Sequence, residues 1–244
     1  MLVTIHNISF DLSQPIDISI PLHPGEPQVN CYFAPPFKIE PVVMGDFIGD
    51  IKMGGLLNYK NVSLNPHGNG THTECVSHIA DLPVSINQAL KNFHFIAQLI
   101  TVRPQQTENG DELIQKEHLI NIIHPYTEAI IIRTLPNTAD KHHKNYNKTN
   151  PPYLHYEAAN YLREQNILHL LIDLPSLDRE EDDGKLLAHR AYWNYPAAPR
   201  LHATVTELIY VPDEIHDGVY LLNLQIPSFE MDAAPSKPVI FPSI

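Results

Sequence analysis

The sequence predicts a single α/β domain with a mixed sheet, spanning residues 1–244. Residues 129–133 read Ala-Ile-Ile-Ile-Arg and residues 167–174 read Ile-Leu-His-Leu-Leu-Ile-Asp-Leu, and short apolar runs of this kind are typical of buried strands. Between them, residues 155–165 have the apolar spacing of a helix. A strand, a helix and a second strand in succession indicate a βαβ unit with parallel pairing.

The chain before this unit is expected to be mostly extended. Residues 8–21 alternate apolar with polar side chains, which is a strand pattern, and Pro15 and Pro21 interrupt it. Residues 22–36 contain four prolines and predict a loop. We further expect a β-hairpin at 42–57, a strand at 61–64, a helix at 85–91, a strand at 93–102, a loop at 104–112 and a helix at 115–123.

The second half alternates long polar segments with short apolar ones. Residues 135–152 are rich in proline, asparagine and lysine, which predicts a loop long enough to act as a lid. Its histidines, His142 and His143, are expected to be solvated. Residues 178–183 hold five acids and one arginine and predict a solvated loop. The remaining expected elements are a helix at 186–193 and strands at 204–211 and 219–226.

Composition narrows the classes of partner. The net charge of −12 argues against binding to nucleic acid or to an anionic membrane, because both need a basic face. Cys31 and Cys75 do not form a disulfide framework, and we expect Cys75 to pack as a small hydrophobe rather than to bind metal. No apolar run reaches membrane-spanning length, and the N-terminus lacks the basic segment of a signal peptide. We expect a cytoplasmic protein that acts on a small molecule.

The chemistry is concentrated in residues 65–79, Asn-Pro-His-Gly-Asn-Gly-Thr-His-Thr-Glu-Cys-Val-Ser-His-Ile. His67, His72 and His78 surround one carboxylate, Glu74. Neutral imidazole and carboxylate are the usual ligands of zinc and similar divalent ions. Because His67 and His78 lie too far apart on a straight strand to share one ion, we expect either a bend or two ions that share Glu74.

The local structure around Glu74 has two interpretations. If a helix begins here, Thr71 and Glu74 match the pattern of a capping box, and Glu74 and His78 lie one turn apart. If the chain is extended, His72 and Glu74 share one face of a strand. Either conformation places Glu74 near a histidine.

A catalytic metal site keeps a coordination position open for water and draws ligands from distant segments. His189 and Glu207 are the candidates, since an acid within an apolar strand is costly unless it is paired or bound to metal. His202 and Glu214 are the rivals. Asp173 is a further candidate, because it follows a buried strand at the edge where open α/β sheets place their sites.

These residues resemble a known family. The stretch Gly70-Thr71-His72-Thr73-Glu74, followed by His78, resembles the Gly-Thr-His-x-Asp-x-Pro-x-His signature of the cyclase family, which includes bacterial kynurenine formamidases and isatin hydrolases. The other segments that resemble the family are Asp17-Ile18-Ser19-Ile20-Pro21-Leu22-His23-Pro24-Gly25, Arg133-Thr134, Asp173-Leu174-Pro175-Ser176-Leu177-Asp178, Ala188-His189-Arg190, Glu207-Leu208, Gly218-Val219-Tyr220 and Leu224 to Pro227. The resemblance implies a swivelling β/β/α-type domain that forms homodimers or homotetramers.

The resemblance also implies a ligand set. Its members are His67, His72, Glu74, His78, His189 and Glu207. His67, His72 and Glu74 would hold one divalent ion, and the other three, with Glu74 as a bridge, would hold or surround a second. Zinc is the expected metal, and manganese is the alternative. His78, His189 and Glu207 are the predicted catalytic residues.

The chain departs from the family pattern at several points. Four residues separate His67 from His72 where the family has three, Glu74 replaces an aspartate, and residues 194–200 form an insertion. His67 is therefore the least secure of the ligands. These differences indicate that the chain is a divergent member of the family that it resembles.

The expected function is metal-dependent hydrolysis of an amide, formamide or lactam C–N bond, as in the kynurenine formamidases of tryptophan catabolism. The alternatives are a metal-dependent cyclase or isomerase and a non-enzymatic metal-binding protein. Phe33, Tyr192 and Trp193 would either form a wall for an aromatic substrate or simply pack in the core.

Overall fold

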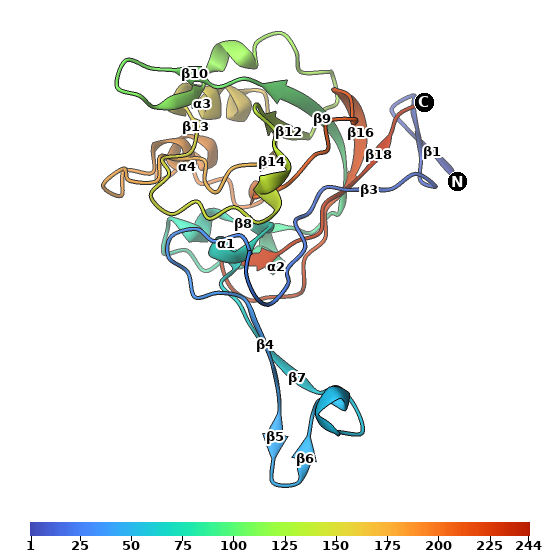
Figure 1. Cartoon of the computed structure of the whole chain (residues 1–244). Helices are drawn as coiled ribbons and strands as arrows, with labels where there is room; N and C mark the ends of the chain where they lie inside the picture. Colours follow the sequence, from blue (N-terminus) through green and yellow to red (C-terminus); the bar gives the residue numbers. More distant parts are fainter.

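The computed structural model describes residues 1–244 and centres on a curled, nine-stranded mixed sheet (Figure 1). The strands of this sheet are β3 (Ile16–Asp17), β8 (His72–Glu74), β9 (His94–Val102), β12 (Ala129–Thr134), β14 (His169–Ile172), β15 (Thr204–Glu207), β16 (Gly218–Asn223), β17 (Ala233–Pro235) and β18 (Val239–Pro242). Their order is β17-β8-β15-β14-β12-β9-β16-β18-β3. The four strands from β15 to β9 are parallel, and every other pair is antiparallel. The predicted α/β class with a mixed sheet is confirmed.

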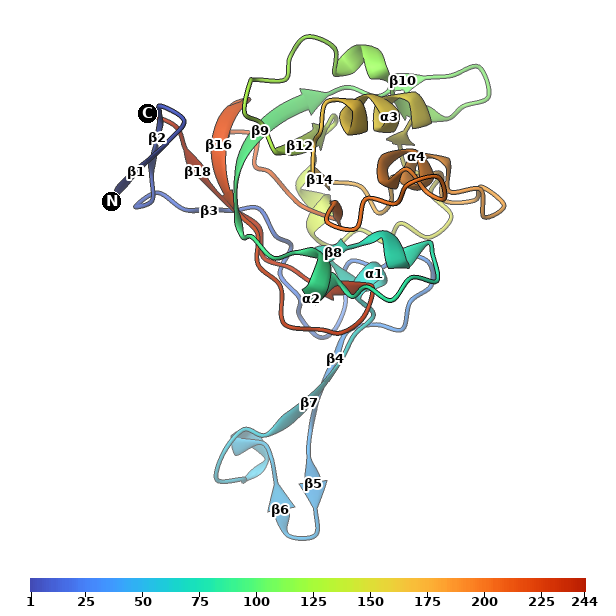
Figure 2. The ribbon, with the colours of Figure 1, turned by 180° about the vertical axis from the view of Figure 1, so that it is seen from behind.

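The predicted βαβ unit is formed by β12, α3 (Tyr156–Glu164) and β14. β12 and β14 pair in parallel, with Ala129 opposite His169. Helix α3 buries Ala158, Ala159 and Leu162, and it packs against α4 (Leu187–Trp193) on one face of the sheet (Figure 2). The larger core cluster lies between these two helices and the sheet.

The second core cluster includes the short helix α2 (Ile86–Ala89), which is closed at its start by a capping box of Ser85 and Gln88. Cys75 is fully buried in this cluster, and its Sγ lies 3.6 Å from the carbonyl of Val84. As the sequence predicts, Cys75 packs as a small hydrophobe.

Three sequence predictions need correction. Residues 115–123 form only a 3-10 turn, η3 (Lys116–His118), because Asn121 adopts a left-handed conformation that a helix cannot continue through. The expected loop at 104–112 contains β10 (Gln105–Gln106) and the start of β11 (Glu112–Ile114), which pairs with β13 (Tyr153–Leu154). The strand expected at 204–211 ends at Glu207, because Leu208 is also left-handed.

A long β-hairpin leaves the body of the molecule, and we call residues 38–63 the arm (Figures 1 and 2). Its elements are β4 (Lys38–Pro41), β5 (Val43–Met44), β6 (Phe47–Ile48), η1 (Ile51–Met53) and β7 (Lys60–Ser63). The predicted hairpin at 42–57 is its outer part. A smaller hairpin, β1 (Leu2–Ile5) and β2 (Ile8–Asp11), lies at the other end of the molecule beside the C-terminus.

The predicted loop at 135–152 contains the turn η4 (Ala139–His142) and is anchored to the sheet. The ammonium group of Lys141 is buried and lies 2.7 Å from Asp173, at the end of β14. The ring of His142 packs on Tyr210. None of the helices is long and apolar enough to cross a lipid bilayer.

Candidate metal centre

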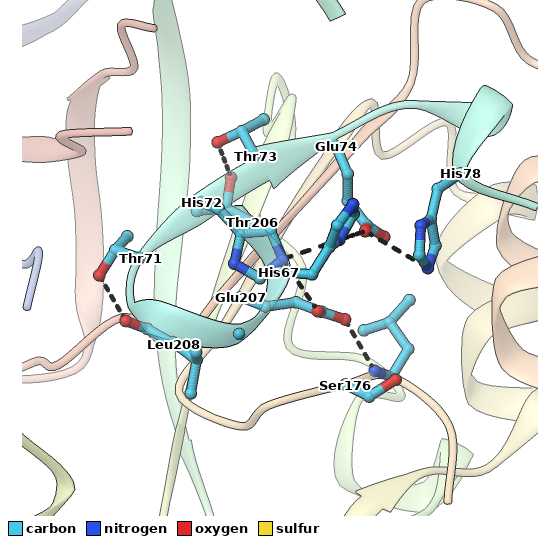
Figure 3. Close-up of polar contacts among 12 residues, drawn as sticks. His67, Thr71, His72, Thr73, Glu74, His78, Ser176, Thr206, Glu207 and Leu208 are labelled. Carbon is cyan, nitrogen blue, oxygen red and sulfur yellow. Dashed lines mark hydrogen bonds and ion pairs between the residues drawn. The ribbon is translucent and has the colours of Figure 1, made fainter. Parts of the chain in front are cut away.

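The site is built on β8, which lies between β15 and β17. Because successive side chains of a strand point to opposite faces, His72 and Glu74 share one face. His72 lies opposite Glu207 in the register with β15, and its Nε2 is 3.3 Å from the Glu207 carboxylate (Figure 3). The segment is therefore a strand, and the pairing brings together two residues that are far apart in the sequence.

The alternative with a helix beginning near Thr71 is wrong. The hydroxyl of Thr71 donates to the carbonyl of Leu208 and accepts the backbone N–H of Ile20. The Glu74 carboxylate faces imidazoles rather than a backbone amide. Thr71 and Glu74 thus form no capping box. Thr71 instead connects the start of β8 to neighbouring segments by hydrogen bonds, and Glu74 belongs to the site.

His67 reaches the site through α1 (Pro66–Asn69), a single helical turn. Asn65 caps this turn by accepting the N–H of Gly68, and the proline at the first helical position favours it. The turn supplies the bend that the spacing requires: His67 Nδ1 lies 3.1 Å from Glu74 Oε2, and Nε2 lies 2.9 Å from Asp232. The extra residue before His72 therefore does not remove His67 from the cluster.

His78 ends η2 (Val76–His78), directly after β8. Its Nε2 lies 3.7 Å from Glu74 Oε2, and its Nδ1 lies 3.3 Å from the Asp232 carboxylate. Its ring stacks on that of His67, with centroids 4.3 Å apart. In Figure 3, His78 lies on the other side of Glu74 from His72, and its side chain is 30% exposed.

His189 comes from α4. Its Nε2 lies 3.1 Å from Glu74 and 3.6 Å from Glu207. Its Nδ1 lies 2.6 Å from the Asp178 carboxylate, which also accepts the backbone N–H groups of Ala188 and His189. Asp178 thus fixes both the start of α4 and the orientation of the His189 ring.

The structure brings all six predicted residues into one cluster and adds two that the sequence analysis did not assign to it. Asp232, next to β17, contacts His67 and His78. It has no sequence signal, because only the pairing of β17 with β8 brings it near. Asp178 does have one: it is the last residue of the segment that resembles the family, although the surrounding acids predict a solvated loop.

The rival residues lie elsewhere. His202 and Glu214 are exposed and belong to none of the groups of converging side chains. Asp173 is paired with Lys141 and accepts the N–H and hydroxyl of Thr134. Tyr192 and Trp193 are fully buried in the core. They pack rather than form a wall for a substrate.

The donor atoms suit a divalent cation. His72 Nδ1 faces the carbonyl of Gly70, which only accepts, so the proton resides on Nδ1 and Nε2 presents a lone pair. This buried Nε2 and the buried Oε2 of Glu74 have no hydrogen-bond partner. Lone pairs that face one another in a buried site repel unless a cation lies between them. Three groups of nearby donor atoms result: His67, His72 and Glu74; Glu74, His78 and His189; and His67, His78 and Asp232.

The electrostatics of the cluster agree with this interpretation. Burial opposes ionisation of Glu74, but the charge of His78 and the neighbouring imidazoles of His189 and His67 outweigh burial and hold its pKa well below the usual range. Burial opposes charging of His67, but Asp232 and Glu74 raise its pKa to about 10. Asp178, Glu207 and Glu74 likewise raise the pKa of His189 against the effect of burial. Without a cation, protons on His67 and His189 balance the carboxylates, and a bound metal ion would displace them.

A cavity of about 190 Å³ adjoins the cluster and is lined by His67, His78, His189 and Glu207. Tyr32, Ser176 and the loop from Asp178 to Leu186 complete its walls. Burial and the nearby Glu207 raise the pKa of Tyr32, so its hydroxyl remains protonated. The cluster is therefore open to a small molecule on one side.

The chain is similar to proteins of a known family. Residues 10–179 match the model of the family described as "Putative cyclase". The kynurenine formamidase of Bacillus anthracis is 23% identical over 245 residues, covering 95% of this chain and 96% of that protein.

Several solved structures share the fold. Isatin hydrolase A from Labrenzia aggregata has a TM-score of 0.69 at 15% identity, with 95% of this chain and 94% of that chain covered. A potential metal-dependent hydrolase with cyclase activity has a TM-score of 0.67 at 14% identity, with 93% and 97% covered. From the match to the family model, which spans most of the chain, it follows that this protein belongs to the cyclase family.

Proposed function

We propose that this protein is a metal-dependent hydrolase that cleaves the C–N bond of an amide, formamide or lactam. The observation that carries the proposal is the convergence of six imidazole and carboxylate side chains beside one small cavity. The names of the relatives, a kynurenine formamidase and an isatin hydrolase, support hydrolysis of amide-type bonds. A kynurenine formamidase-like activity, and with it a role in tryptophan catabolism, is the finer form of this proposal.

We propose that His67, His72 and Glu74 hold one ion and that Glu74, His78, His189 and Glu207 hold or surround a second. Two of the three donor groups share Glu74, which supports its role as a bridge. Zinc suits this set of nitrogen and oxygen donors, and manganese is the alternative. A divalent ion bound here would lower the pKa of a coordinated water to about 7 and polarise a carbonyl oxygen.

The proton transfers fall to the residues that face the cavity. His189 is oriented by Asp178 at one ring nitrogen, so its other nitrogen, Nε2, points towards the cavity between Glu74 and Glu207. In this position it can accept a proton from the attacking water and return it to the leaving amine. Glu207 accepts the N–H of Leu177 with one oxygen, which holds its other oxygen towards His72. His78 lies at the mouth and is the second candidate for proton transfer.

Hydrolysis is tested by product analysis in water labelled with oxygen-18. With N-formylaniline as substrate, we expect the metal-loaded protein to release aniline and formate that carries one labelled oxygen. A cyclase or isomerase would leave the label out of its product. Unlabelled product, or no turnover on a panel of formamides, amides and lactams, would contradict the proposed function.

We also propose that the protein forms homodimers or homotetramers through the arm. A two-stranded hairpin is marginal in water by itself, and large exposed apolar patches mark interaction sites. The exposed large apolar residues of the arm are Ile39, Val43, Met44, Phe47, Ile51, Met53, Leu56, Leu57, Tyr59 and Val62. The arm carries three lysines and three acids, so it is neutral in a chain of net charge −12. A second copy of this acidic chain would therefore meet the least electrostatic repulsion at the arm.

The arm interface is tested by light scattering. We expect the wild type to have two or four times the chain mass of 27.6 kDa. A variant with Met44→Lys and Leu56→Lys should be a folded monomer, because both side chains are exposed within one chain and cost little to replace. Leu2→Lys, at an exposed position outside the arm, is the control and should leave the mass unchanged. A monomeric wild type at micromolar concentration would contradict the interface.

A cytoplasmic location is our final proposal for the whole protein. Both cysteines are free and buried, which is usual where thiols are kept reduced.

A further inference from the structure

Tyr32 and Phe33 are consecutive bulky residues in the left-handed conformation, with φ of 54° and 53°. Side chains with a Cβ rarely adopt this conformation, and bulky ones do so only where the surrounding structure enforces it. Such backbone outliers cluster at ligand sites. In the turn at residues 31–34, the surrounding structure therefore holds the side chains of Tyr32 and Phe33 in directions that their backbone conformation alone would not favour.

Two neighbouring segments hold this turn. On one side it lies on α1, the helical turn that carries His67: Cys31 N–H donates to the carbonyl of Gly68 at 3.0 Å. Gly68 and Ala34 are packed so closely that there is no room for a side chain at position 68: a Cβ there would lie 2.2 Å from the Cβ of Ala34. The turn is thus fixed relative to a candidate metal ligand.

On the other side, the turn is held by Asn147 in the long loop. The Phe33 N–H donates to the side-chain oxygen of Asn147 at 2.7 Å. The amide group of Asn147 in turn donates to Asn30, whose own amide group donates to the carbonyl of Ala34. The loop expected to act as a lid therefore serves here as a brace for Tyr32.

The braced turn places Tyr32 in the wall of the cavity beside the metal cluster. The cavity is rich in acceptors, because four carboxylates line it: Asp178, Glu180, Asp182 and Glu207. An amide substrate presents a carbonyl oxygen, which needs a donor. Two nitrogens of Arg179 already have acceptors: Nε donates to Asp111 at 3.0 Å and Nη1 donates to the carbonyl of Glu181 at 2.8 Å.

We propose that Tyr32 is a substrate-binding residue whose hydroxyl donates a hydrogen bond to the carbonyl oxygen of the bond that is cleaved. The inference rests on the proposed hydrolase function. Negative charge develops on this oxygen when water adds to the carbonyl carbon, so the hydrogen bond strengthens in the transition state. No proton is transferred from Tyr32, and its role is to hold the oxygen in place.

The first test compares Tyr32→Phe with Tyr126→Phe. Tyr126 also has a positive φ, 73°, but is exposed and stacks on His6 far from the cavity. With N-formylaniline, we expect kcat to fall about 100-fold in Tyr32→Phe, with KM changed by less than roughly threefold. Bound metal should be unchanged in both variants. A Tyr32→Phe enzyme with the kcat of the wild type would overturn the proposal.

A second variant separates binding from a structural role. Glycine adopts a positive φ without strain, so Tyr32→Gly should keep or raise the thermal unfolding midpoint of the metal-free protein while kcat falls as in Tyr32→Phe. A tyrosine that only supports the fold would show the reverse: a lower midpoint and an unchanged kcat per folded molecule.

If the wild type shows no hydrolysis, a binding measurement still tests the role of Tyr32. Acetohydroxamate presents a carbonyl oxygen to a metal site, and calorimetry should find it bound roughly five- to tenfold more weakly by zinc-loaded Tyr32→Phe than by wild type or Tyr126→Phe. Equal affinities would refute the role of Tyr32. A wild type that binds the hydroxamate but hydrolyses no formamide, amide or lactam would instead refute the proposed function.

Discussion

Glu74→Gln is expected to abolish the activity and to release most of the bound metal. The change keeps the volume of the side chain but removes the charge that faces His67, His78 and His189. Loss of groups that merely support metal ligands typically costs 10–100-fold in affinity or activity, so we expect more than about 100-fold in metal affinity for the bridging carboxylate itself. Metal per chain after dialysis and turnover of N-formylaniline are the two measurements.

Glu128→Gln is the matched control for this change. Glu128 is exposed, and its carboxylate accepts only the backbone N–H of Ile96, far from the cluster. Metal content and turnover should equal those of the wild type. If Glu74→Gln also keeps both, Glu74 is not a ligand, and the two-ion arrangement that shares it is wrong.

Asp178→Asn is expected to lower kcat by about 10²–10⁴, the usual contribution of a positioned acid or base, without removing the metal. The Asp178 carboxylate accepts from His189 Nδ1 at 2.6 Å, so Nε2, which faces Glu74, is the ring nitrogen that exchanges a proton. An asparagine can donate to Nδ1 through its amide group, which would place the ring proton on Nε2 instead. The dependence of kcat on pH and the metal content per chain distinguish this effect from loss of the site.

Asp173→Asn provides the comparison for Asp178→Asn. Both aspartates are buried, but Asp173 pairs with Lys141 and does not contact the cluster. Leaving the buried ammonium group of Lys141 unpaired should lower the free energy of unfolding by about 3–5 kcal/mol, with kcat per folded molecule unchanged. If Asp178→Asn behaves in the same way, Asp178 only stabilises the start of α4 and does not orient His189 for catalysis.

Much of the fold could be predicted from local sequence patterns. The apolar runs of β9, β12 and β14 and the helical spacing of α3 each depend on contacts that repeat within one element. Two of the three failures occur where one residue changes the backbone direction. The left-handed Asn121 prevents a helix from continuing beyond η3, and the left-handed Leu208 ends β15. Neither position carries glycine, the residue that most often signals this conformation.

The residues of the candidate site also fall into two groups: those that the local sequence indicates and those that only strand pairing brings to the site. His72, Glu74 and His78 are recognisable because one short stretch supplies all three. Glu207 stands out only as an acid within an apolar strand, and its position opposite His72 is a property of the β8–β15 register. Asp232 could not be predicted, because nothing in its own sequence neighbourhood indicates the pairing of β17 with β8 that brings it to His67.

The most direct test of an open catalytic metal site measures bound metal and hydrolysis on the same sample. The protein is stripped with a chelator, zinc or manganese is added back in steps, and the metal content and the turnover of N-formylaniline are determined at each step. We expect turnover to vanish with the metal and to return in proportion to the ions rebound, saturating at one or two per chain. Turnover that persists in the stripped protein would contradict the central claim.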